Sequence, residues 1–143
     1  MNTDTTTDRI IAVDHGMSLE AMIAAGKYDW VNDNITPDKF PVDGRGIKKF
    51  RTKLFDFGRI LSEDAVAAMR AKNFMPAGHV HGLAFGATFP DEQRKYPIAC
   101  LASSAQVRGP RFVLCLNRNG AKRRLYLGTW DGGWSSFWRF LGV

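Results

Sequence analysis

The segment that determines the fold, residues 98–129, reads IACLASSAQVRGPRFVLCLNRNGAKRRLYLGT. It contains three runs with the composition of strands, at 98–104, 111–118 and 121–129. The last two flank Asn119-Gly120, a dipeptide favoured in tight type I′ hairpins because both of its residues tolerate a positive φ. The segment therefore predicts consecutive antiparallel strands.

Two further segments extend this predicted sheet. Residues 134–143 are rich in aromatic side chains and follow the turn residues 131–133. Residues 48–57 contain an alternating stretch, with Phe50, Thr52 and Leu54 on one side and the basic residues Lys49, Arg51 and Lys53 on the other. Alternation with a period of two is typical of a strand with one buried face. The sequence therefore predicts an antiparallel sheet of four to five strands.

Three other segments, 18–28, 62–74 and 76–88, have apolar residues at helical spacing. Ser18 and Ser62 are suited to cap the first two helices, and Pro76 suits the first turn of the third. The third segment contains three glycines that indicate either close packing or a break in the helix: Gly78, Gly82 and Gly86. The expected fold is α+β, with two or three helices packed on one face of the sheet.

The length of 143 residues suits a single domain, and we expect one domain over residues 1–143. The polar residues 1–9 are expected to form a disordered tail, and residues 29–47 a long loop. No apolar run approaches the roughly 18 residues of a membrane-spanning helix, and no signal peptide is evident. The sequence favours a cytoplasmic protein without membrane association.

Charge is unevenly distributed along the chain, whose net charge is +6. The first 43 residues contain eight acidic and three basic residues, whereas the remainder contains six acidic and seventeen basic residues. A positive field of this kind attracts polyanions, although many basic proteins bind nothing specific with it. The acidic third of the chain is equally able to lie against the basic part and neutralise it.

Two groups of basic residues are candidates for contacting phosphates. They are expected on one strand and around a hairpin tip, and comprise Lys49, Arg51, Lys53, Arg118, Lys122, Arg123 and Arg124. Aromatic residues nearby would stack on unpaired bases if they were exposed. The first hypothesis is therefore non-catalytic binding of an anionic partner, in particular nucleic acid. Charged hairpin tips are also common simply because they are solvated.

The aromatic C-terminal segment supports an alternative hypothesis. Residues 130–143 contain more aromatic side chains than one strand buries easily, and excess aromatic surface is typical of interfaces. Trp130, Trp134 and Trp138 would then form a protein-binding module or a homodimer seam. In the alternative interpretation, Trp134, Phe137 and Phe140 fill the core between the sheet and the helices.

Evidence for catalysis is weaker, so a small enzyme of unknown reaction is the third hypothesis. His79 and His81 have no neighbouring acid or cysteine that completes a metal site, so no metal is expected. No phosphate-binding glycine motif occurs, so no cofactor is expected either. Asp14 and His15 are adjacent in the sequence, and adjacent residues usually point apart, so they are not expected to form a catalytic pair. Ser103 and Ser104 lack the flanking glycines of a nucleophile elbow. Two cysteines, Cys100 and Cys115, are expected to be buried hydrophobes, although a disulfide between neighbouring strands is also conceivable.

Several stretches resemble a group of small uncharacterised bacterial proteins whose C-terminal half combines a helix with a sheet. The resemblance rests on residues 75–86, on Pro90 with 93–98, and on 130–131 with 139–141. It covers about half of the chain. No activity is assigned to that group, so the resemblance implies a fold of this kind and transfers no functional residue.

Overall fold

The computed structural model describes residues 8–143. Its strands are β1 (Arg9–Asp14), β2 (Trp30–Val31), β3 (Ile47–Phe55), β4 (Ile98–Gln106), β5 (Arg111–Asn119), β6 (Lys122–Thr129) and β7 (Arg139–Gly142), and its helices are α1 (Leu19–Gly26), α2 (Ser62–Ala71), α3 (His79–Thr88) and α4 (Glu92–Lys95). Residues 1–7 of the expected disordered tail lie outside the described residues. Arg9 was wrongly placed in that tail, because it begins a strand.

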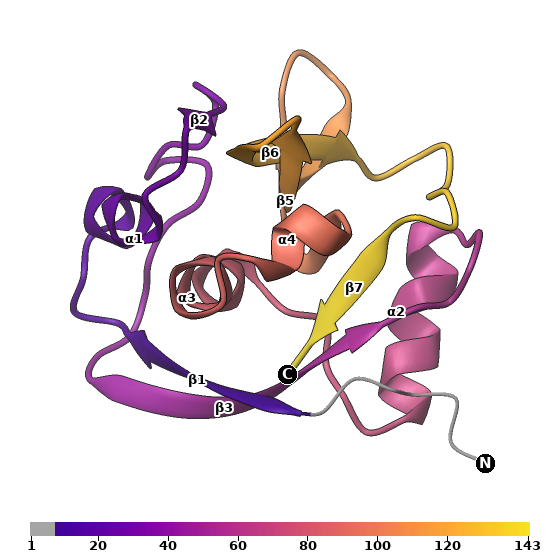
Figure 1. Ribbon diagram of the computed structural model, residues 1–143, viewed down its shortest axis with the longest axis horizontal. Coiled ribbons are helices and arrows are strands. Elements are labelled where there is room, and N and C mark those ends of the chain that lie inside the picture. The colour runs from indigo at the N-terminus through magenta and orange to yellow at the C-terminus, as the bar shows by residue number, and fades with distance from the viewer. Residues whose placement is uncertain (1–7) are drawn as a thin grey trace.

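Within the described residues, the seven strands form one sheet in the order β1-β3-β7-β4-β5-β6-β2 (Figure 1). The predicted α+β class is confirmed, but the sheet is larger than expected and is not purely antiparallel. The C-terminal strand β7 lies between β3 and β4, antiparallel to the first and parallel to the second. The two-residue β2 also pairs in parallel with β6. Both parallel pairs join segments far apart in the sequence, which local patterns do not reveal.

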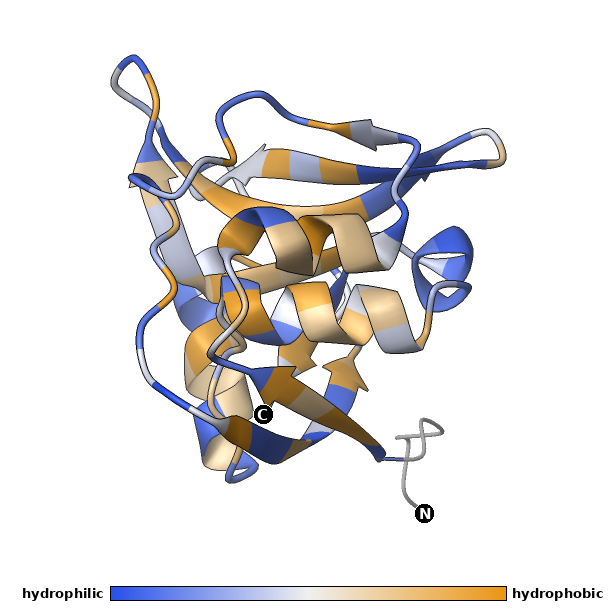
Figure 2. Cartoon of the chain, turned by 90° about the vertical axis from the view of Figure 1, so that its left-hand side faces the viewer, coloured by the Kyte–Doolittle hydropathy of each residue, from blue (hydrophilic) through white to orange (hydrophobic). Residues whose placement is uncertain are grey.

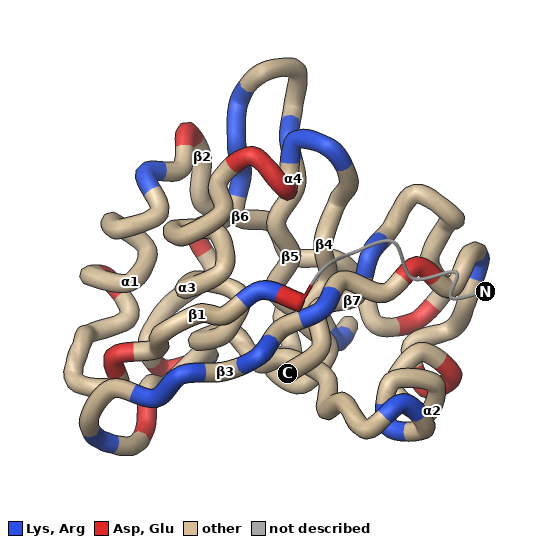
Figure 3. Tube along the Cα trace, turned by 60° about the horizontal axis from the view of Figure 1, so that its bottom comes forward, with Lys and Arg blue, Asp and Glu red and all other residues tan. Residues whose placement is uncertain are grey.

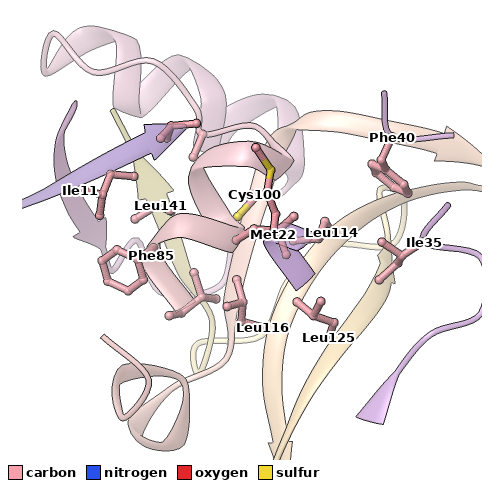
Figure 4. Packing of buried hydrophobic residues seen from close by; sticks show 14 of the residues in the cluster. Ile11, Met22, Ile35, Phe40, Phe85, Cys100, Leu114, Leu116, Leu125 and Leu141 are labelled. Atoms are coloured by element: carbon pink, nitrogen blue, oxygen red, sulfur yellow. The ribbon is translucent and has the colours of Figure 1, made fainter. Parts of the chain in front are cut away.

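The helices do not all pack on one face, contrary to the prediction. Ile98 and Cys100 of β4 belong to a cluster with residues of α1 and α3, part of which Figure 4 shows. Ala99 and Leu101 belong to a second cluster, which contains Ala65 and Met69 of α2. Successive strand residues point to opposite faces, so α2 covers the face away from α1 and α3. The continuous apolar run of β4 is typical of a strand buried on both faces.

Helices α1 and α3 lie side by side on their face of the sheet (Figure 2). The predicted cap of α1 is confirmed, since Ser18 Oγ accepts the backbone N–H of Ala21 at 3.0 Å. Helix α3 begins at His79 rather than in the turn after Pro76, because Pro76 forms an isolated bridge with Gly142. A Cβ at Gly82 would lie 2.6 Å from Cys100 Sγ. The glycine therefore allows close packing of α3 on β4.

The predicted role of Ser62 as a helix cap is wrong. Leu61 occupies the cap position of α2 without a side-chain hydrogen bond. The buried Ser62 hydroxyl instead donates to the Trp130 carbonyl at 2.7 Å and accepts from Trp134 Nε1 at 2.8 Å. It thereby attaches α2 to the segment that precedes β7.

The hairpin between β5 and β6 is tight, but its turn differs from the predicted one. Asn119 pairs with Lys122, so Gly120 and Ala121 are the two loop residues. Of these two, Gly120 alone has a positive φ, of 60°. A glycine with positive φ at the first loop position is the type II′ pattern rather than type I′.

Cys100 and Cys115 are free and fully buried, as the reading of both as small hydrophobes predicted. They belong to clusters on opposite faces of the sheet, so they do not face one another. Among residues 8–143, no helix is long and apolar enough to span a membrane.

Candidate functional site

The two predicted basic groups lie in different parts of the molecule. In the sheet order, β7, β4 and β5 separate β3 from β6. Figure 3 accordingly shows the Lys and Arg residues of β3 apart from those near β6. The seven predicted phosphate contacts therefore do not form one patch.

The basic side chains of β3 face an acidic residue that precedes β1. Arg51 Nε lies 3.2 Å from a carboxylate oxygen of Asp8, and Lys53 Nζ lies 3.9 Å from the other oxygen. The Arg51 guanidinium also covers the Phe74 ring, at 4.6 Å from its centroid. Lys49 is exposed. Part of the positive charge of β3 is thus neutralised by Asp8, an acidic residue of the first third of the chain. The uneven charge distribution had left open whether the acidic third lies against the basic part.

Arg123 is buried, so its predicted role at a phosphate is wrong. Its side chain is 4% exposed. The guanidinium donates to four partners at 2.5 to 2.9 Å, namely the carbonyls of Gly26, Gly86 and Pro90 and the side chain of Gln93. Its backbone N–H donates to Asp29 at 2.7 Å. Arg123 therefore joins the C-terminal end of α1 to α3 and α4.

The other two arginines of the hairpin remain at the surface or near it. Arg118 donates to the carbonyls of Arg94 and Gly120, both at 3.0 Å. Arg124 is half-buried, with its guanidinium 4.6 Å from the Trp30 ring centroid and 5.1 Å from that of Tyr126. Lys122 is exposed beside the turn. No carboxylate among the described residues forms an ion pair with Arg118 or Arg124.

A pocket of about 630 Å³ lies beside this hairpin. It is formed where α4, β5 and the segment before β7 meet, and its lining residues are Gln93, Lys95, Tyr96, Pro97, Asn117, Arg118, Phe137 and Trp138. Phe137 is 72% exposed and Tyr96 is 43% exposed, which is unusual for large aromatic side chains. The pocket thus combines aromatic walls with basic residues.

Two polar side-chain atoms of the β5–β6 pair lack hydrogen bonds, and one of them belongs to Asn117, which lines the pocket. Asn117 Oδ1 and Arg124 Nε are buried and have no partner among the described residues. Asn117 of β5 lies directly opposite Arg124 of β6 in the sheet register, so the two side chains share a face. Most buried polar atoms in proteins are paired, because an unpaired one costs about 1 to 3 kcal/mol. An unpaired acceptor and an unpaired donor are therefore adjacent here.

The three tryptophans predicted to form an interface have different surroundings. Trp134 is 4% exposed and packs in the core, so its predicted role at an interface is wrong. Trp130 donates to Glu63 at 2.7 Å, and Arg111 covers its ring at 3.7 Å. Trp138 packs edge-on against Trp134 and lines the pocket. The aromatic segment thus contributes Trp138 and Phe137 to the same pocket as Arg118.

The candidate catalytic residues are only partly brought together. Asp14 accepts the Gly16 N–H at 2.9 Å and His15 contacts the Gly46 carbonyl at 3.2 Å, so these two residues do not pair. No three His, Cys, Asp or Glu side chains of residues 8–143 gather in a way that would hold a metal ion. His79 and Ser103, which the sequence did not connect, are in contact at 2.7 Å.

The chain matches no protein-family model, no curated protein and no solved structure.

Proposed function

We propose that the protein binds single-stranded nucleic acid in the pocket beside the β5–β6 hairpin. One base would occupy the pocket, and the flanking phosphates would contact Arg118 and Lys95. The observation that carries this proposal is the lining of the pocket, in which the exposed rings of Phe137 and Tyr96 lie beside Arg118 and Lys95. A nucleotide offers both a donor on its base edge and acceptors on its base and phosphate.

The aromatic walls favour an unpaired base over a duplex. Phe137 and Tyr96 are exposed at the pocket, and Trp138 also lines it. Stacking of a base on an aromatic side chain contributes about 1 to 3 kcal/mol and tolerates any base. A base in a duplex keeps both of its faces stacked on neighbouring base pairs, so a pocket that admits one base requires a single strand.

The charges around the pocket favour a polyanion. Arg118 and Arg124 contact carbonyl oxygens and aromatic rings, and no described carboxylate neutralises either of them. Lys95 is paired with Glu92 at 3.1 Å but is largely exposed. Contacts of this kind hold phosphates without reading sequence, and they weaken as salt increases.

The test is a titration of tryptophan fluorescence with a short single-stranded oligonucleotide. Trp138 lines the pocket and Trp30 stacks on Arg124, so occupancy is expected to change the emission. We expect Phe137→Ala to weaken binding about tenfold or more, because it removes one stacking surface. Its side chain is 72% exposed, so the fold is expected to remain intact.

The matched control is Ile47→Ala. Ile47 is 68% exposed at the start of β3, where it pairs with Asp14 of the edge strand β1 and does not line the pocket. It should leave affinity unchanged, and a duplex of the same length should bind more weakly than the single strand. Equal affinities of Phe137→Ala and Ile47→Ala would refute the proposed pocket.

A further inference from the structure

The N-terminus of α3 contacts an irregular part of β4. Ser103 Oγ lies 2.7 Å from His79 Nδ1 and accepts the His79 backbone N–H at 2.9 Å. The register of β4 against β5 shifts between Cys100 and Ser104, so Ser103 falls outside the regular ladder. Such bulges re-aim side chains and are frequent beside active sites.

The second ring nitrogen of His79 fixes its tautomer. His79 Nε2 lies 2.7 Å from the Pro41 carbonyl oxygen, which only accepts hydrogen bonds, so Nε2 bears a proton. Burial lowers the pKa of His79 below its usual value, so the ring is neutral near neutral pH. Nδ1 is then an acceptor, and the Ser103 hydroxyl donates to it. The Ser103 hydroxyl thus contacts the His79 ring, and the ring contacts the Pro41 carbonyl. A nucleophile, its general base and the group that positions the base are arranged in this order.

The surroundings of Ser103 suit an attacking oxygen. Ser103 and His79 are half-buried rather than enclosed. A Cβ at position 78 would lie 2.9 Å from Ser103 Oγ, so glycine at this position leaves the oxygen uncovered on that side. Val80 and His81 lie in the first turn of α3, where backbone N–H groups have no acceptor within the helix. Amides of this kind stabilise a developing oxyanion.

We propose that Ser103 and His79 form an acyl-transfer site that hydrolyses carboxylic esters. Ser103 Oγ attacks the ester carbonyl carbon while its proton moves to His79 Nδ1. The bond between the acyl carbon and the leaving oxygen then breaks, and His79 returns the proton to that oxygen to release an alcohol. Water attacks the acyl-serine next, with His79 again taking and returning one proton, which releases a carboxylic acid and restores Ser103.

This site is independent of the proposed nucleic-acid pocket. Ser103 lies at the N-terminus of α3, next to Ser104, which pairs with Val113 of β5, whereas the pocket lies near the other end of β5, at Asn117 and Arg118. Loss of either function by mutation is therefore expected to leave the other intact. A purely structural role, in which Ser103 only caps α3, predicts no reactivity.

The experiment treats the full-length protein with a fluorophosphonate reagent, which forms a stable bond to an activated serine as fluoride leaves. We expect one adduct per chain, which peptide mass spectrometry places on Ser103. His79→Gln should slow the labelling by about 100-fold or more, because it removes the general base. Hydrolysis of p-nitrophenyl acetate should decrease in parallel.

The matched control is Ser104→Ala, which removes the neighbouring hydroxyl that accepts from Arg111 Nε at 2.9 Å. It should label like the wild type, whereas Ser103→Ala should not label at all. Mapping the adduct on the wild-type protein decides the site independently of how well Ser103→Ala folds. An unlabelled Ser103 in the folded wild-type protein, or an unchanged labelling rate in His79→Gln, would overturn the proposal.

Discussion

Arg123→Ala is expected to destabilise the protein by about 3 kcal/mol or more. The substitution leaves the carbonyls of Gly26, Gly86 and Pro90 and the side chain of Gln93 without their charged donor. Each buried polar group that loses its partner typically costs about 1 to 3 kcal/mol. A protein of this size is stable by only about 5 to 15 kcal/mol, so the loss is a large part of the total.

Urea unfolding followed by circular dichroism measures this effect, with Lys122→Ala as the control. Lys122 is the neighbouring, exposed residue, and its substitution should change the free energy of unfolding by no more than about 0.5 kcal/mol. Arg123→Lys should also be destabilising, because one ammonium group does not reach the four acceptors of a planar guanidinium. If Arg123→Ala and Lys122→Ala were equally stable, the structural role assigned to Arg123 would be wrong.

Gly82→Ala is expected to destabilise the protein by about 1 to 3 kcal/mol, although alanine is the better helix former. Its new methyl group would lie 2.6 Å from Cys100 Sγ and 3.4 Å from Leu114 Cδ2. Overpacking a close-packed core costs about 1 to 3 kcal/mol, whereas the gain in helix propensity is at most about 1 kcal/mol. Thermal or urea unfolding of the variant gives the sign directly.

A double-mutant cycle identifies the atom responsible for this loss. Cys100→Ala removes the sulfur that the new methyl group meets, so the combination of Gly82→Ala with Cys100→Ala should be more stable than the two separate losses predict. Residues in contact typically couple by about 0.5 to 3 kcal/mol. Strict additivity would show that the sulfur is not what excludes a side chain from position 82.

The sequence predicted the parts of the fold that depend on local patterns. The alternation around Phe50 and the apolar runs on either side of Gly120 correspond to β3, β5 and β6. The position of β7 between β3 and β4 depends on pairings between distant residues, which leave no local signal. The sequence did not predict β1. Its apolar pattern, in which Ile11 and Val13 are buried, is short and directly follows a polar segment. Helix α2 lies on the face of the sheet opposite α1 and α3. The continuous apolar run of β4 is typical of a strand buried on both faces, and so it indicated that both faces are covered.

The candidate site was only partly predictable for a different reason. From residue type alone, Arg118, Arg123 and Arg124 were all predicted to contact phosphates. The structure shows that Arg123 is buried. Successive residues of a strand point to opposite faces of the sheet. The adjacent positions of Arg123 and Arg124 therefore indicated that one of the two faces the helices. Asn117 was missed because an asparagine near a turn is ordinary, and only the structure reveals its unpaired oxygen.

Photocrosslinking tests the central claim most directly, because it reports where a nucleic acid lies on the protein. A single-stranded oligonucleotide with a photoreactive base is irradiated in complex with the protein, and crosslinked peptides are identified by mass spectrometry. We predict crosslinks at Gln93 and within residues 95–97, 117–118 and 137–138, which line the pocket. Crosslinks confined to β3, or none at saturating oligonucleotide, would contradict the proposal that this pocket binds single-stranded nucleic acid.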